Sequence, residues 1–203
     1  MYTITGDRKN IFETENYLDK DTGYPERDIN WFKTQILPDF LSLQFINNNK
    51  KLLDVGCAFG YFTKLLSENF NETLGIDFSE NRINYAKTHE NAKLKFKLAD
   101  LTADNFVETI NNSYDILFTS AVIQHIDKNL IPKVLKNLYN IAAPGAYFVM
   151  YDELAPVSQG LWERPDRFVT RFTIDWLTNK LQDWKLIDYK QIDGDMHRLV
   201  LQK

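Results

Sequence analysis

Short apolar runs alternate with segments of helical periodicity from Lys51 onward, and this alternation restricts the fold more than any other feature of the sequence. The apolar runs predict strands at residues 52–55, 73–77, 94–98, 114–118 and 146–151. The amphipathic segments between them predict helices at residues 60–70, 79–88, 104–110 and 130–142. Strands that alternate with helices in this way build an α/β fold, a doubly wound and mostly parallel sheet with helices on both faces.

The two ends of the chain depart from this alternation. Residues 1–49 are expected to form an N-terminal helical cap or lid, with one helical run at 26–45 that Pro38 should kink. Residues 50–203 are expected to form the main domain, with an irregular insertion at about 152–172. A last helix at 173–181 precedes strands at 185–189 and 197–201, which should pair antiparallel because no crossover helix fits between them.

Composition excludes several classes of protein. The chain carries 24 Lys and Arg against 28 Asp and Glu, a net charge of −4, so a nucleic-acid partner is disfavoured. The single cysteine, Cys57, cannot form an intrachain disulfide or a cysteine-rich metal site. The sequence shows neither a secretory signal nor an apolar run that could span a bilayer. We therefore expect a soluble protein of the reducing cytoplasm, without a membrane partner and of undetermined oligomeric state.

The segment after the first predicted strand has the pattern of a nucleotide-binding loop. The strand ends at Asp54, and Gly56 and Gly60 permit a tight turn that backbone can bring close to a ligand. Asp77 ends the next strand, where a carboxylate accepts hydrogen bonds from a ribose diol in nucleotide-binding sheets. Asp100 follows the third strand, where a carboxylate can meet an adenine amino group.

This set of features resembles the class I S-adenosylmethionine-dependent methyltransferases over about residues 50–151, and the closing strands fit their Rossmann-like, seven-stranded sheet with an antiparallel last strand. The segment from Asp54 to Gly60 corresponds to their first motif, with Ala58 in place of its middle glycine. The resemblance implies S-adenosylmethionine as cofactor and S-adenosylhomocysteine as product, with Asp77 on the ribose. Other residues implied to contact the cofactor are Gly56, Cys57, Phe78, Asp100, Leu101, Thr119 and Ser120.

The acceptor side is less sharply defined by the sequence. His125 follows the fourth predicted strand in a segment that resembles the Leu-Glu-His stretch of many small-molecule methyltransferases, so we expect it to act as base or to position the acceptor. The short cap favours a small acceptor that is methylated on O or N, such as a sugar, a phosphorylated metabolite or a natural-product intermediate. Candidate substrate residues are Tyr17, Tyr24, Tyr151, Arg164 and Arg167.

Three alternatives remain open from sequence. A dinucleotide-dependent oxidoreductase would need a glycine where Tyr61 stands. The second alternative is a methyltransferase that acts on RNA or another nucleic acid. Amino-methylating DNA enzymes of this fold resemble one another in a pair of prolines after the fourth strand, where this chain has Thr119–Val122. A non-catalytic binding module on the same fold is the third alternative. No metal is expected, because Asp127, Asp152 and Glu153 are interpreted as solvated acids at loop ends.

Overall fold

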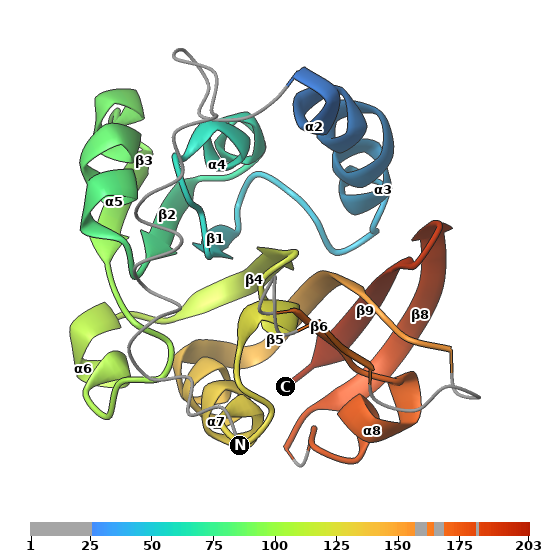
Figure 1. The fold of residues 1–203 in the computed structure, drawn as a ribbon. Helices are drawn as coiled ribbons and strands as arrows, with labels where there is room; N and C mark the ends of the chain where they lie inside the picture. Colours follow the sequence, from blue (N-terminus) through green and yellow to red (C-terminus); the bar gives the residue numbers. More distant parts are fainter. Residues whose placement is uncertain (1–25, 157–161, 165–168, 182) are drawn as a thin grey trace. The chain divides into compact units, whose positions relative to one another are not determined.

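A computed structural model describes residues 26–156, 162–164, 169–181 and 183–203 of the chain (Figure 1). The chain divides into two compact units, Met1–Ala99 and Asp100–Lys203. The hydrogen-bonded strand order is β3-β2-β1-β4-β5-β9-β8, with a separate two-stranded sheet of β6 and β7. This order, with the antiparallel closing strands described below, confirms the predicted seven-stranded α/β sheet. The proposed boundary between a cap and a main domain at residue 50 stays a prediction.

The first unit is built on three parallel strands in the order β3-β2-β1. These strands are β1 (Lys51–Val55), β2 (Glu72–Asp77) and β3 (Leu94–Leu98). Their connections are α4 (Tyr61–Ser67) and α5 (Glu80–Ala86), the second of which continues into a short 3-10 helix at Lys87–His89. The Ser79 hydroxyl accepts from the Arg82 N–H and so caps α5, as its sequence predicts.

The N-terminal helical run is interrupted before Pro38 and not at it. It consists of α2 (Glu26–Trp31), a π-helical turn (Phe32–Ile36) and α3 (Leu37–Leu41). The Leu37 N–H donates to the Phe32 carbonyl, a wider i→i+5 turn that lets the chain continue although Pro38 has no N–H. Phe32 stacks on Phe62 of α4 with ring centroids 4.1 Å apart, which fixes this run within its unit.

The second unit contains the other four strands of the sheet in the order β4-β5-β9-β8. They are β4 (Tyr114–Ser120), β5 (Ala142–Glu153), β8 (Lys185–Asp193) and β9 (Met196–Gln202). Strands β4 and β5 are parallel, whereas β9 is antiparallel to both β5 and β8. The helices of this unit are α6 (Phe106–Ile110), α7 (Ile131–Ile141) and α8 (Ile174–Thr178).

The strand after α7 begins four residues earlier than predicted, whereas the predicted end of the helix is confirmed within one residue. Helix α7 ends at Ile141 and β5 begins at Ala142, so Pro144 and Gly145 lie within the strand and not between helix and strand. The register shift between Tyr114 and Ile116 accommodates them, since Tyr114 lies opposite Ala142 and Ile116 opposite Tyr147. The insertion is also less irregular than predicted, because β6 (Trp162–Arg164) and β7 (Val169–Arg171) pair antiparallel within it.

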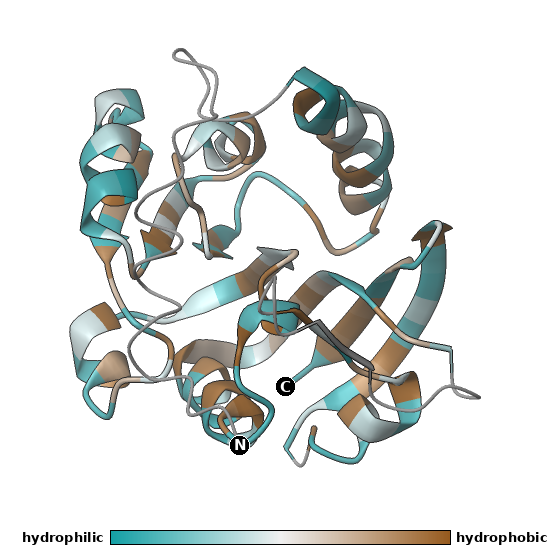
Figure 2. Ribbon diagram, in the orientation of Figure 1, coloured by the Kyte–Doolittle hydropathy of each residue, from teal (hydrophilic) through white to brown (hydrophobic). Residues whose placement is uncertain are grey.

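Hydrophobic and hydrophilic residues are distributed along these elements as the amphipathic pattern requires (Figure 2). Helix α7 buries residues at three- and four-residue spacing, Ile131, Val134, Leu135, Leu138 and Ile141. Trp184 packs against Phe148 of β5, and its indole N–H donates to the Leu135 carbonyl, so α7 and β5 share one core. Within the described part of the chain, no helix is long and apolar enough to cross a membrane.

Candidate cofactor and acceptor sites

The loop between β1 and α4 is fixed to the end of β2 by backbone hydrogen bonds. The N–H groups of Gly56 and Cys57 both donate to the Ile76 carbonyl, at 2.8 and 2.9 Å. Gly56, Ala58 and Gly60 have φ angles of +77°, +45° and +78°, so alternate residues of the loop are left-handed. Ala58 therefore adopts the conformation that favours glycine at the position where the family motif has one, and it does so at a steric cost.

Gly60 is needed for packing inside the protein. A Cβ on this residue would lie 2.6 Å from Cζ of Phe96 and 2.8 Å from Cβ of Ala86, in a direction already filled by β3 and α5. Gly75 on β2 faces the same ring, with a Cβ position 2.6 Å from Phe96 Cδ1. The sequence interpretation, in which Gly60 leaves room for a ligand, therefore misses the neighbour that occupies its open side.

Asp77 connects the loop to the start of α5. Its Oδ2 accepts from the Ala58 N–H at 3.0 Å, and its Oδ1 accepts from the Ser79 N–H at 2.9 Å. Burial raises the pKa of this carboxyl, an effect that the Ser79 hydrogen bond, the nearby Arg82 charge and the Ala58 hydrogen bond oppose. A carboxylate has about four lone-pair positions, and the backbone N–H groups of Ala58, Phe78 and Ser79 use three of them, so the group keeps acceptor capacity for a ribose hydroxyl.

Asp54 and Cys57 point their side chains into the protein. The Thr63 hydroxyl donates to Asp54 Oδ2 at 2.5 Å, and burial raises the pKa of Asp54 to about 7. Cys57 belongs to a buried cluster with Ile83, Ala86, Leu94 and Phe96, and burial raises the pKa of its thiol. Both side chains therefore shape the loop, and a cofactor contact from Cys57 would come from its backbone. Phe78, the next predicted contact, is half-buried.

Asp100 and Leu101 lie at the start of the second unit, two and three residues after β3 ends. Asp100 Oδ1 accepts from the N–H of Thr102 at 2.9 Å and from its hydroxyl at 2.7 Å, which closes a tight local turn. The Leu101 carbonyl accepts from the Asn137 side-chain amide at 2.8 Å. Asn137 of α7 thereby holds the segment on which the predicted adenine contacts lie.

Thr119 and Ser120 are the last residues of β4, not residues just beyond it as the sequence suggested. Thr119 is buried opposite Met150, and its hydroxyl has no hydrogen-bond partner among the described residues. An unpaired buried hydroxyl is costly, and its position at the carboxyl end of a parallel strand fits a site that a polar ligand completes. Ser120 is half-buried opposite Tyr151.

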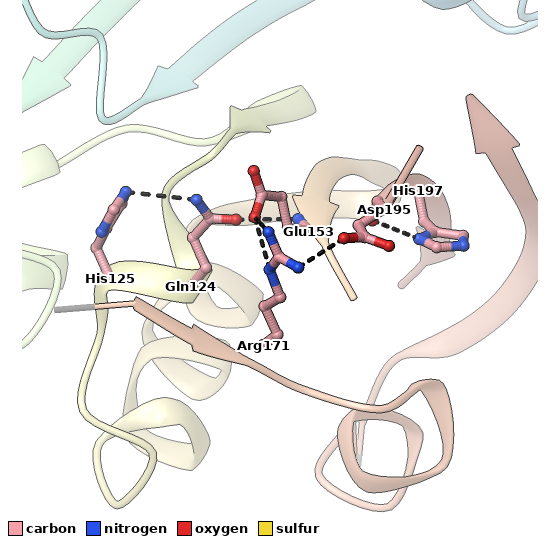
Figure 3. Close-up of polar contacts among 6 residues, drawn as sticks. All are labelled: Gln124, His125, Glu153, Arg171, Asp195 and His197. Carbon is pink, nitrogen blue, oxygen red and sulfur yellow. Dashed lines mark hydrogen bonds and ion pairs between the residues drawn. The ribbon is translucent and has the colours of Figure 1, made fainter. Parts of the chain in front are cut away.

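His125 ends a 3-10 turn (Ile123–His125) that is held by the end of β5 (Figure 3). The Gln124 N–H donates to Asp152 Oδ1 at 3.1 Å, and the Glu153 N–H donates to Gln124 Oε1 at 3.0 Å. The second bond fixes the orientation of the Gln124 amide, whose nitrogen then faces His125 Nε2 at 3.5 Å. Since an amide nitrogen only donates, this contact needs the tautomer in which Nε2 is the acceptor.

Two acids expected to be solvated are part of this arrangement. Asp152 is 2% exposed, and burial raises its pKa to about 7 against the opposing effect of backbone N–H groups of the turn. Glu153 accepts from Arg171 Nε at 2.7 Å, and Arg171 also pairs with Asp195 at 2.6 Å (Figure 3). The sequence reading of Asp152 as a solvated acid at a loop end was therefore wrong. Asp152 is the last of five consecutive buried residues, 148–152, at the end of β5, a strand that is covered on both faces there.

The remaining predicted substrate residues are not brought together by the described part of the structure. Tyr151 is fully buried on β5, and its ring lies 5.7 Å from that of Phe118, so this packing does not support a substrate contact. Arg164 belongs to β6, and its side chain lies outside what the structure describes. Tyr17, Tyr24 and Arg167 lie outside the described residues. Among the described residues, no group of three His, Cys, Asp or Glu could hold a metal ion.

Comparisons with known proteins find a similarity to methyltransferases. Residues 53–150 match the model of a methyltransferase domain. The chain is 26% identical over 168 residues to a probable S-adenosyl-L-methionine-dependent methyltransferase, TehB, of Haemophilus influenzae, covering 81% of this chain and 56% of the relative. It is 28% identical over 118 residues to phosphoethanolamine N-methyltransferase 3 of Arabidopsis thaliana, covering 56% and 23%.

The solved structures agree on the fold. An S-adenosylmethionine-dependent methyltransferase from Mesorhizobium loti superposes with a TM-score of 0.63 at 15% identity, covering 82% of this chain and 96% of that one. These matches are to S-adenosylmethionine-dependent methyltransferases, the class that the loop after β1 resembles. The match spans little more than half the length of its TehB relative.

Proposed function

We propose that this chain transfers the methyl group of S-adenosylmethionine to an oxygen or nitrogen atom of a small molecule. The observation that carries the proposal is the loop after β1, which Asp77 fixes through the Ala58 N–H. A ribose hydroxyl can donate to a rigid carboxylate, and Asp77 keeps acceptor capacity beside its backbone hydrogen bonds. We assign the nucleoside end of the cofactor to this loop and to Asp77, with Asp100 and Leu101 for the adenine.

The acceptor end is assigned to the turn after β4. S-adenosylmethionine supplies an electrophilic methyl group on a sulfonium, so the protein mainly has to orient the acceptor atom. A hydroxyl acceptor must also lose its proton, and the His125 imidazole is the proposed base. The unpaired Thr119 hydroxyl is proposed to bond the methionine end of the cofactor.

A small acceptor is favoured over a nucleic acid. The chain has a net charge of −4, which does not favour a phosphate backbone. The Arabidopsis relative is named for phosphoethanolamine, a small phosphorylated molecule. That name and the short N-terminal cap both support a small molecule as the acceptor. A reducing cytoplasm as the location belongs to the same proposal, on the grounds of the single buried cysteine.

Turnover of His125→Asn tests the acceptor assignment, with release of S-adenosylhomocysteine as the readout for a panel of hydroxyl and amine acceptors. If the acceptor is a hydroxyl, kcat should fall by about a hundredfold or more while affinity for S-adenosylhomocysteine stays within about twofold. If it is an amine, the loss should be much smaller. Cofactor affinity that falls in parallel with kcat would contradict the assignment of His125 to the acceptor side.

Gln124→Glu tests how His125 is tuned. In this variant, one carboxylate oxygen still accepts from the Glu153 N–H. The other oxygen replaces the amide nitrogen beside His125 Nε2, and this negatively charged acceptor favours the protonated imidazolium. For a hydroxyl acceptor, the rise of kcat with pH should therefore move to higher pH, whereas Gln124→Met should not move it in that direction. An unchanged pH profile in a folded Gln124→Glu enzyme would show that His125 is not the base.

A further inference from the structure

Strand β8 is the exposed edge of the sheet in the second unit. It is the last strand in the sheet order, and β9 is its only hydrogen-bonded neighbour among the described strands. Ile187 and Tyr189 are 41% and 43% exposed, and they are two of the three large hydrophobic side chains that are exposed in the described part of the chain. Such an edge carries unpaired N–H and C=O groups and is a template for a further strand.

The sequence of β8 is complementary to itself when it is read in the opposite direction. If two copies pair antiparallel about Tyr189, Lys185 of each copy lies opposite Asp193 of the other, and Asp188 lies opposite Lys190. The same register sets Leu186 opposite Ile192 and Tyr189 opposite itself. Every charged residue of the strand then faces a residue of opposite sign, an arrangement that stabilises cross-strand pairs.

The observed backbone register puts all four charges on one face, as this pairing requires. On β9, Lys185 lies opposite Gln202, Asp188 opposite Val200, Lys190 opposite Arg198 and Asp193 opposite Met196. These partners are every second residue of β9, and alternate residues of a strand share a face. Two register shifts, at Leu186/Asp188 and Gln191/Asp193, keep the four charges in phase although their spacing in the sequence is uneven.

Lys185 and Asp193, the outermost charges of β8, are available for ion pairs with a second copy. Lys185 and Asp193 form no ion pair within the described residues, and both are exposed. Lysines and bulges at a sheet edge ordinarily prevent association, because an incoming strand meets unpaired charge. In the antiparallel pair, Asp193 of the second copy lies opposite Lys185 of the first. These charges therefore disfavour pairing with other strands but favour pairing with a second β8.

We propose that two copies of this chain associate through their β8 edges, antiparallel and centred on Tyr189, so that the sheet continues from one copy into the other. The interface combines main-chain hydrogen bonds, two Lys185–Asp193 pairs and the apolar contacts of Tyr189 and its neighbours, and Asp188, which already pairs with Arg198 of β9, lies opposite Lys190 (Figure 2 shows how hydrophilic and hydrophobic residues interleave along β8).

Sedimentation equilibrium of the full chain with a charge swap tests this interface. Lys185→Asp and Asp193→Lys each place like charges opposite one another at two positions per dimer, and each should weaken dimerisation by about tenfold or more. The double variant Lys185→Asp/Asp193→Lys restores opposite signs and should return to within about threefold of the original dissociation constant. Lys87→Asp, an exposed change of the same net charge away from β8, should have no effect.

Crosslinking gives an independent readout of the register. Tyr189→Cys brings one thiol of each copy into direct opposition, at a Cα separation that a disulfide spans, and Cys57 is buried. Oxidation by diamide, which takes up the two electrons and two protons of the thiols, should give a covalent dimer of Tyr189→Cys but not of Thr88→Cys. A monomer at all concentrations, or a dimer that neither charge reversal weakens, would overturn the proposal, and so would a double variant that stays weak.

Discussion

Gly60→Ala should destabilise the protein far more than an ordinary glycine substitution, because two separate costs meet at this residue. Its φ of +78° is a left-handed conformation that costs an L-residue about 1–2 kcal/mol. The new Cβ would also lie 2.6 Å from the Phe96 ring and 2.8 Å from Ala86. Relieving such overpacking costs about 1–3 kcal/mol. Reduced freedom of the unfolded chain returns about 0.4–1 kcal/mol, so the net loss should be about 1–5 kcal/mol, with a central value of about 3 kcal/mol.

Gly145→Ala is the matched control. This glycine has a nearly identical φ of +73°, but its Cβ position has nothing within 4 Å, so only the conformational cost applies. We expect a loss of about 1 kcal/mol or less. Urea unfolding at constant m-value gives both free energies of unfolding, and a Phe96→Leu change should suppress part of the Gly60→Ala cost by making room at the ring.

The result that would refute this reasoning is a Gly60→Ala variant no less stable than Gly145→Ala. Gly60 would then be free of internal packing, and its only role would be to leave room for a ligand. In that case Gly60→Ala would lower the affinity for S-adenosylhomocysteine and leave the free energy of unfolding unchanged.

Two further predictions concern the same region and the end of β5. Burial raises the pKa of Asp54 and of Asp152 from 3.8 to about 7, so the folded state binds more protons than the unfolded state between these values. The free energy of unfolding should therefore fall as pH rises from 5 to 7.5, and Asp54→Asn or Asp152→Asn should flatten that slope in urea titrations; a slope unchanged in both variants would contradict the assignment. Ala58→Gly removes a left-handed L-residue with φ of +45°, so it should leave stability unchanged or raise it by up to about 1 kcal/mol, whereas a clear loss in thermal unfolding would show that this conformation carries no strain.

Local patterns predicted the order and type of the main elements because each depends on neighbouring residues. The spacing of apolar residues in α7 and the Ser79 cap of α5 are confirmed for this reason. The π-helical turn before Pro38 was not predictable in the same way, since a proline marks a disturbance without fixing which turn absorbs it. The short pair β6 and β7 depends on pairing across a loop and leaves little periodic signal.

Contacts between distant residues explain what the sequence could not show at the candidate site. Gly60 reads as a turn glycine until Phe96, thirty-six positions later on β3, is seen against it. Asp152 reads as an acid at the end of a strand until its bond to the Gln124 N–H places it in the interior. Asp77 was predicted as a ligand of the ribose, and the structure adds that it also holds the loop through the Ala58 N–H.

Calorimetric titration of the full chain with S-adenosylhomocysteine, and separately with NAD, shows which nucleotide the loop after β1 binds. We expect one molecule of S-adenosylhomocysteine bound per chain, no heat with NAD, and an affinity about tenfold or more weaker in Asp77→Asn, which loses the charge that a ribose diol meets. Binding of NAD in place of S-adenosylhomocysteine, or an Asp77→Asn protein that binds S-adenosylhomocysteine as tightly as the original, would contradict this expectation.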